Sequence, residues 1–136
     1  MTVVATSTTA SVDISGKGAG TLTITVECNE DSSLTATKTY TKYGVVLGDD
    51  WDVDGDIISV DVTTNGTITD QTVSASYLAD GDSPGEESDI SSLVTREIGK
   101  ISIDLTGVTG AGLVRLAVGI TEDMSAMASK SYTKTV

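Results

Sequence analysis

Residues 21–28 read TLTITVEC and alternate strictly between apolar and polar side chains. Leu22, Ile24, Val26 and Cys28 fall on one face of an extended chain, and three threonines and a glutamate fall on the other. A period of two is the pattern of a β-strand that buries one face. Threonine suits the wet face, because its β-branched side chain packs well on a pleated surface. The stretch therefore predicts a half-buried strand.

The same alternation recurs along the chain. Residues 100–105 repeat it, and two further inward rows are Ile58, Val60 and Val62, and Val114, Leu116, Val118 and Ile120. Weaker patterns predict further strands at residues 2–6, 12–14, 73–77 and 127–136, and one long strand over 34–47 with a bend near Gly44. These strands would lie at intervals typical of all-β proteins.

Glycine, asparagine and aspartate mark the turns between these strands. Asn65-Gly66 is a hairpin signal, and residues 80–89 form the longest polar loop. No window has a convincing helical stripe, so 88–95 and 121–128 are expected to form one turn of helix at most. The pattern predicts a single all-β domain over 1–136, an antiparallel sandwich or barrel of about eight strands.

The end of the chain resembles a known class of domain. Residues 112–123 read GLVRLAVGITED and residues 129–136 read SKSYTKTV. This pair is similar to the closing strands of bacterial and phage immunoglobulin-like β-sandwich domains. The resemblance implies an immunoglobulin-like antiparallel sandwich and transfers no functional residue. The chain departs from antibody-type domains, because it has no cysteine pair and its one tryptophan, Trp51, lies in an acidic segment.

Composition excludes several functional classes. The 136 residues include no histidine and one cysteine, so a disulfide within the chain, a histidine-based zinc site and a histidine-activated nucleophile are all excluded. We therefore expect no enzymatic activity. No apolar run approaches the ~20 residues of a membrane span, and residues 1–8 lack the basic start of a secretion signal. The net charge of −12 argues against nucleic acid and anionic membranes as partners.

The negative charge belongs to the middle of the chain. No lysine or arginine falls between Tyr43 and Thr95, whereas that segment holds twelve of the twenty acidic residues. One interpretation is a pair of solvated acidic loops that keep the protein soluble. The other is a cation site, because clustered carboxylates repel one another unless something compensates them.

Residues 50–57 read DWDVDGDI and fit the spacing D-x-D-x-D-G-x-I. This looks like the first part of an EF-hand calcium loop, in which Asp50, Asp52 and Asp54 turn their oxygens onto one hard cation. A glycine permits the sharp turn, Asp56 would offer its backbone carbonyl, and Asp61 stands at the twelfth position. Strands are expected on both sides in place of helices.

We therefore predict a Ca²⁺ loop of similar local shape between two strands, with Asp50, Asp52, Asp54, Asp56 and Asp61 as candidate ligands. The acidic loop at 80–89 could supply another ligand across space. The alternative is a solvated acidic turn, which the turn preferences of glycine and aspartate explain without a metal.

Two further residues have alternative interpretations. Trp51 would either cap the end of the sandwich or provide a binding surface for a sugar or a protein partner. Cys28 would be a buried, inert thiol, with pairing between chains as the minor alternative.

By elimination, the leading functional prediction is a structural or accessory protein of a large assembly. A phage virion decoration protein of the head, or a tail accessory protein, fits a small acidic sandwich that binds by surface complementarity. Its partners would be a capsid or tail protein or copies of itself, which includes a homo-oligomer. The alternatives are a carbohydrate-binding or adhesive module on an extracellular surface, and a self-assembling fibre or surface-layer subunit that donates a strand from its threonine-rich start.

Overall fold

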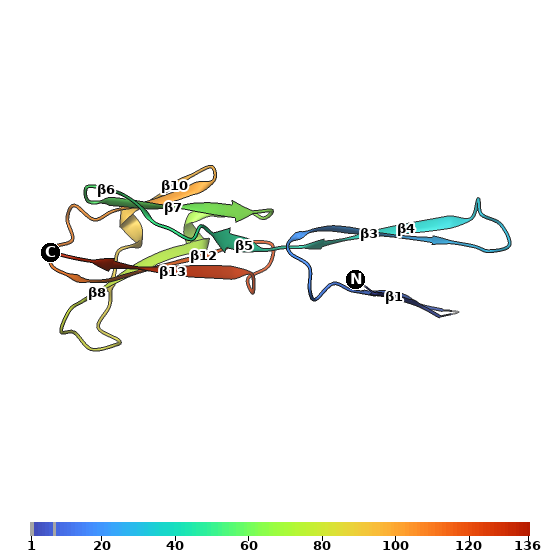
Figure 1. Ribbon diagram of the computed structural model, residues 1–136, viewed down its shortest axis with the longest axis horizontal. Coiled ribbons are helices and arrows are strands. Elements are labelled where there is room, and N and C mark those ends of the chain that lie inside the picture. The colour runs from blue at the N-terminus through green and yellow to red at the C-terminus, as the bar shows by residue number, and fades with distance from the viewer. Residues whose placement is uncertain (1, 7) are drawn as a thin grey trace. The chain divides into compact units, whose positions relative to one another are not determined.

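A computed structural model describes residues 2–6 and 8–136, and it is all-β with antiparallel pairing throughout (Figure 1). Contacts between Cα atoms divide the chain into two compact units. We call residues 1–42 the hairpin unit and residues 43–136 the sandwich unit. Each is described by itself.

The hairpin unit consists of two antiparallel pairs of strands. β1 pairs with β2, and β3 pairs with β4. The strands are β1 (Thr2–Ala5), β2 (Ala10–Asp13), β3 (Gly20–Glu27) and β4 (Thr35–Lys42). The Lys42 ammonium donates hydrogen bonds to the carbonyl oxygens of Ile14 and Lys17, which ties the β2–β3 connection to the end of β4. Among the described residues of this unit, none is buried.

The first sheet of the sandwich unit runs in the order β10-β11-β7-β5, and β6 also pairs with β7. Its strands are β5 (Val45–Leu47), β6 (Asp52–Asp54), β7 (Ile57–Thr64), β10 (Val94–Glu97) and β11 (Lys100–Asp104). The second sheet runs in the order β13-β12-β8-β9. Its strands are β8 (Val73–Ala79), β9 (Ser88–Asp89), β12 (Gly112–Gly119) and β13 (Met127–Lys134). Two short 3-10 helices, η1 (Asp70–Thr72) and η2 (Ser91–Leu93), precede β8 and β10.

One apolar core joins the two sheets. Alternate residues of β7 and β11 face alternate residues of β8 and β12, as in a β-sandwich. The described residues of this core with almost no exposed surface are Ile58, Val60, Ile101, Ile103, Leu105, Val114, Leu116, Val118 and Ile120. The inward rows predicted at 58–62 and 114–120 are therefore confirmed.

The strand predicted at 21–28 is confirmed, but its apolar row does not belong to this core. Leu22 and Ile24 are half-buried and Val26 is exposed. Cys28 is half-buried rather than buried, and its Sγ donates to Oε2 of Glu30 at 3.2 Å. The pattern identifies a strand, but a two-stranded hairpin has no second layer to cover its apolar face. The assignment of residues 1–136 to one domain stays a prediction.

Two predicted connections are wrong. Residues 34–47 form two strands in different sheets, because β4 pairs with β3 whereas β5 pairs with β7. Asn65-Gly66 does not close a hairpin, because β7 and β8 belong to different sheets. The glycine is needed for packing rather than for a hairpin turn. A Cβ on Gly66 would lie 2.5 Å from Cδ1 of Ile120, so this position needs a residue without a side chain.

Candidate functional site

The motif predicted as a calcium loop is a β-hairpin. Asp52, Val53 and Asp54 form β6 and pair with the start of β7, where Asp54 lies opposite Ile57. Only Gly55 and Asp56 separate the two strands. Gly55 has φ +61°, and no described residue other than glycine has a positive φ. A glycine at the first loop position with positive φ is typical of a type II′ hairpin turn. The glycine of the motif therefore makes a strand reversal.

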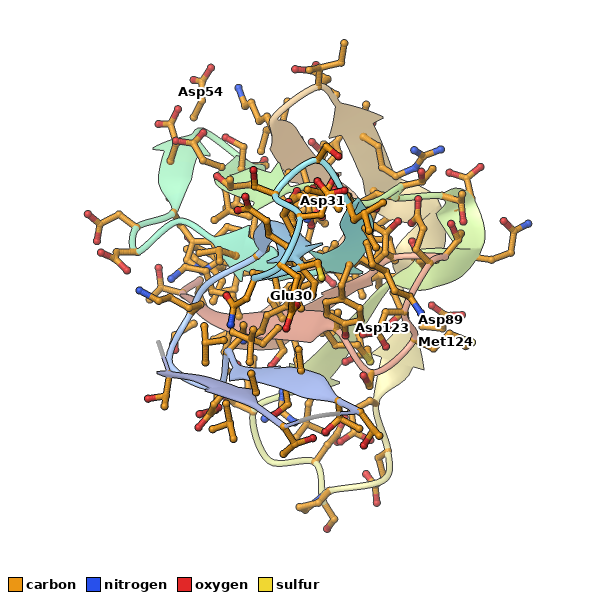
Figure 2. The ribbon with its side chains drawn as sticks, turned by 90° about the vertical axis from the view of Figure 1, so that its right-hand side faces the viewer. Glu30, Asp31, Asp54, Asp89, Asp123 and Met124 are labelled. Atoms are coloured by element: carbon orange, nitrogen blue, oxygen red, sulfur yellow. The ribbon has the colours of Figure 1, made fainter. Side chains whose placement is uncertain are left out.

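The five predicted ligands are spread along this hairpin. Asp52 and Asp54 share the outward face of the sheet with Asp61 of β7, while Asp50 precedes β6 and Asp56 occupies the turn. All five are exposed, and Figure 2 shows the Asp54 side chain outside the ribbon of its hairpin. Side chains two residues apart on a strand stand roughly 7 Å apart and parallel to one another. The outward carboxylates of β6 therefore do not converge as in a calcium loop.

Other groups of the motif already have partners. The Asp56 carbonyl accepts a hydrogen bond from the Leu105 amide at 2.8 Å, and the Asp61 carbonyl accepts one from Gly48 at 2.8 Å. Asp61 lies opposite Lys100 of β11 in the strand register. Within residues 2–6 and 8–136, no group of three or more aspartate, glutamate or cysteine side chains is arranged to hold a metal ion. The 80–89 loop, which could have supplied a further ligand across space, lies within these residues.

Calcium binding by this segment stays a prediction of the sequence, and a thermal melt tests it. The prediction expects millimolar Ca²⁺ to raise the melting temperature, EDTA to reverse the rise, and Asp52→Asn/Asp54→Asn to abolish it. Binding at a concentration 100-fold above the dissociation constant would add about 2.7 kcal/mol to the free energy of unfolding. A melting temperature that Ca²⁺ leaves unchanged would make residues 50–56 a solvated hairpin.

Trp51 fastens the acidic segment to the second sheet. Its indole Nε1 donates to the Ser131 carbonyl of β13 at 2.8 Å, and its ring meets Tyr132 edge-on, with centroids 5.9 Å apart and planes at 70°. One residue along β13, Lys130 Nζ donates to the Asp49 carbonyl at 2.6 Å. Trp51 is half-buried against the core. These are the contacts expected of the capping alternative, and the role of Trp51 as a binding surface stays a prediction.

Many carboxylates are engaged locally in a pattern that the sequence analysis missed. An aspartate followed two residues later by serine or threonine recurs at strand ends and in loops, and the aspartate Oδ1 accepts a hydrogen bond from that residue's backbone amide. These pairs are Asp13–Ser15, Asp31–Ser33, Asp89–Ser91, Asp104–Thr106 and Asp123–Ser125. The hydrogen bonds lower the pKa of each aspartate, since they favour the charged form. The spacing D-x-[ST] was the available signal.

Glu122 also accepts hydrogen bonds from a backbone amide and a hydroxyl, in this case from a residue of another loop. Its Oε1 accepts a hydrogen bond from the Thr67 amide and its Oε2 accepts one from the Thr67 hydroxyl, both at 2.8 Å. The bonds from the Thr67 amide and hydroxyl lower the pKa of Glu122 below its ordinary value of 4.5. The carboxylate thereby links the loop after β7 to the loop after β12.

The lowered pKa gives a pH-dependent prediction. A carboxylate whose pKa is lower in the folded chain stabilises the fold fully above its unfolded pKa and loses this contribution as the pH falls through the folded value. We expect Glu122→Gln to be slightly less stable than the wild type at pH 7, with a gap that closes below pH 4.5. Urea denaturation between pH 7 and 3 measures the gap, with Glu86→Gln in the exposed 80–89 loop as the control. A gap that stays constant over this range would contradict the role of the charge.

A groove of about 720 Å³ lies at the β10–β11 turn of the sandwich unit. Its lining includes Ile68, Ile101 and the fully exposed Ile98, which occupies the turn between the two strands. Arg96 also lines it, but its guanidinium is held by the Asp70 carboxylate at 2.8 Å and donates to the Ile68 carbonyl at 3.0 Å. Threonines and the exposed Glu97 also belong to the lining, so the groove offers apolar contact, hydroxyl groups and a carboxylate.

The hairpin unit presents the other candidate surface. In the β3–β4 register Leu22 pairs with Tyr40, Ile24 with Lys38, and Val26 with Ala36. We call this set the apolar face. Tyr40 is 58% exposed and Val26 is 51% exposed. The opposite face carries seven threonines: Thr21, Thr23, Thr25, Thr35, Thr37, Thr39 and Thr41.

The described helices are far too short and polar to cross a membrane. No family model matches the chain, and neither a curated protein nor a solved structure resembles it significantly.

Proposed function

We propose that this protein is a non-enzymatic structural or accessory subunit of a large protein assembly, a phage virion decoration or tail accessory protein that binds by surface complementarity. The hairpin unit is the observation that carries the proposal. An isolated two-stranded hairpin is marginally stable in water. This unit nevertheless has an amphipathic pattern with exposed Val26 and Tyr40 on one face and threonines on the other. An unpartnered apolar face is typical of an interaction surface.

The sandwich unit favours a subunit that folds by itself over a fibre subunit that needs a neighbour's strand to complete its fold. Among the described residues, the fifteen buried apolar ones all lie in residues 43–136, and both sheets contribute to their cluster. The sandwich core therefore needs no donated strand. Trp51 and Tyr77 support the assembly proposal over sugar binding, because their polar groups are engaged within the sandwich unit; the exposed Tyr40 belongs to the apolar face of the hairpin unit. Trp51 donates its N–H to β13, and Tyr77 is buried with its hydroxyl against the carbonyls of residues 109–111.

The proposal includes an immunoglobulin-like assignment of the sandwich unit. Its support is the pairing of the two stretches that carry the resemblance: β12 and β13 are antiparallel neighbours, with Gly112 opposite Lys134 and Gly119 opposite Met127. The groove beside Ile98 is the proposed contact of this unit with a capsid or tail protein, because it is open and rich in apolar side chains.

Quantitative mass spectrometry of purified virions from the phage or prophage that encodes the chain tests this function. We expect the chain in a fixed ratio to the major capsid or tail protein, and we expect Ile98→Asp to lower that ratio. Ile57→Asp, on the outer face of β7, is the matched control. Purified virions that lack the chain would contradict the proposal.

A further inference from the structure

We propose that the apolar face of the β3–β4 hairpin packs against the same face of a second copy of this chain, with the two hairpins antiparallel. This inference rests on the proposed function, because it names the partner that the hairpin unit takes in the assembly. Three features of the described residues support it: the amphipathic register, the low charge of this unit, and the opposite charges at the two ends of the hairpin.

The strand register gives the hairpin one apolar face and one polar face, so a second layer is needed to cover the apolar face. Leu22, Ile24, Val26, Ala36 and Tyr40 project from one side, and seven threonines project from the other. Two such hairpins packed face to face would enclose their apolar side chains between sheets about 10 Å apart and leave both threonine faces in water. Hydroxyls of the threonine face also meet across the strands, since Thr25 Oγ1 and Thr37 Oγ1 lie 3.4 Å apart.

The charge distribution allows hairpin units to meet and opposes contact between sandwich units. The hairpin unit has four acids and three bases, a net charge of −1, and the remaining −11 of the chain lies in residues 43–136. Like charges of that size repel. Two copies therefore associate more readily through residues 1–42 than through their sandwich units.

The charges within the hairpin are arranged to match an antiparallel copy. Glu27, Glu30 and Asp31 lie at the β3–β4 turn, and Figure 2 labels the last two there. Lys38 stands midway on the apolar face, and Lys17 is next to the open end, where its carbonyl accepts from Lys42. Strands of eight residues separate the two ends by roughly 27 Å. An antiparallel arrangement places the acidic turn of each hairpin beside Lys17 and Lys42 at the open end of the other, whereas a parallel one places acid beside acid.

The acidic turn is well ordered by its own hydrogen bonds. Asp31 Oδ1 accepts from the Ser33 amide at 3.0 Å and from the Ser33 hydroxyl at 2.6 Å, and the Leu34 amide donates to the Asp31 carbonyl. Cys28 Sγ donates to Glu30. These bonds lower the pKa of both carboxyl groups below their ordinary values. In the antiparallel arrangement each contact between two residues occurs twice, once in each direction, as in an interface with twofold symmetry.

Light scattering and sedimentation of the full chain test the pairing. We expect the wild type at tens of micromolar to have twice the chain mass of 13.9 kDa. We expect Ile24→Lys to weaken association by about 100-fold or more, because a second ammonium would be buried opposite Lys38 without a counter-charge. Thr23→Lys is the matched control: it adds the same charge one residue away, on the threonine face, and is expected to keep the dimer. Circular dichroism and Trp51 fluorescence verify that the sandwich unit stays folded.

Charge reversal tests the antiparallel arrangement without altering the apolar side chains. Lys17→Glu and Glu30→Lys should each weaken the dimer, because each reverses the charge at one end of the hairpin, and the chain with both substitutions should regain it. A wild-type monomer at every concentration would overturn the inference. A dimer that persists in both charge-reversal variants would also overturn the inference, since that result fits a parallel arrangement or another surface.

These outcomes separate this inference from the proposed function. A chain that is monomeric in solution but present in virions overturns the pairing alone and leaves an unlike protein as the partner of the apolar face. A dimer that is absent from virions overturns the proposed function alone.

Discussion

Replacement of Ile103 by alanine is expected to lower the free energy of unfolding of the sandwich unit by between about 2 and 5 kcal/mol. Ile103 is 0% exposed and stands in β11 opposite Ile58, at the centre of the core between the two sheets. The substitution removes buried methyl and methylene groups and leaves a cavity that the surrounding close-packed side chains fill only in part. Typical domains are stable by only 5–15 kcal/mol, so this loss is a large fraction of the total.

Urea denaturation followed by circular dichroism measures this effect. Ile98→Ala is the matched control, because Ile98 has the same side chain in the adjacent turn but is fully exposed. The control should change the free energy of unfolding by less than about 0.5 kcal/mol. Equal effects of the two substitutions would contradict the placement of β11 between the sheets.

The second large effect is expected at Gly112, the first residue of β12. A Cβ at this position would lie 2.7 Å from Cε2 of Tyr77 and closer still to the Leu78 carbonyl oxygen. Overpacking that forces side chains off their rotamers and shifts the backbone costs about 1–3 kcal/mol. The Tyr77 hydroxyl also points at the preceding turn, 3.0 Å from the Gly110 carbonyl oxygen. Gly112→Ala should therefore destabilise the sheet and displace the ring of Tyr77.

Denaturation and the near-ultraviolet signal of the tyrosines measure both consequences. Gly107→Ala is the control, because a Cβ on Gly107 meets no atom within 4 Å and its φ is not positive. We expect Gly107→Ala to be nearly neutral. A wild-type stability of Gly112→Ala would mean that β8 and β12 do not approach each other as described.

The sequence predicts strands well where a strict alternation meets a buried sheet. Val114, Leu116 and Val118 form an inward row as expected, and so do Val60 and Val62. Alternation alone does not say what covers the apolar side. Leu22, Ile24 and Val26 have the same period, but they lie on a two-stranded hairpin outside the core. The difference depends on strand pairing far along the chain, which a local pattern does not encode.

The acidic motif shows the same limit at the candidate site. A D-x-D-x-D-G spacing fits a loop whose carboxylates converge, and it also fits a short strand followed by a glycine turn. The pairing of Asp54 with Ile57 selects the second geometry. The deciding residues are Ile58 and Val60, because their burial fixes the register of β7 and turns the neighbouring β6 aspartates outward. The D-x-[ST] turns, by contrast, are local, since they involve residues two apart, but the same spacing also occurs within β7 at Asp61 and Thr63, so it predicts a turn only outside a strand.

A second copy is proposed to cover the apolar face of β3–β4, and hydrogen–deuterium exchange at several protein concentrations tests this pairing. An isolated hairpin opens readily and exchanges fast, whereas a hairpin packed into a second layer is protected. We predict that protection of the amides in residues 20–42 rises with concentration, while β12, in the centre of the second sheet, is protected equally at all concentrations. Exchange in residues 20–42 that does not depend on concentration would contradict the claim.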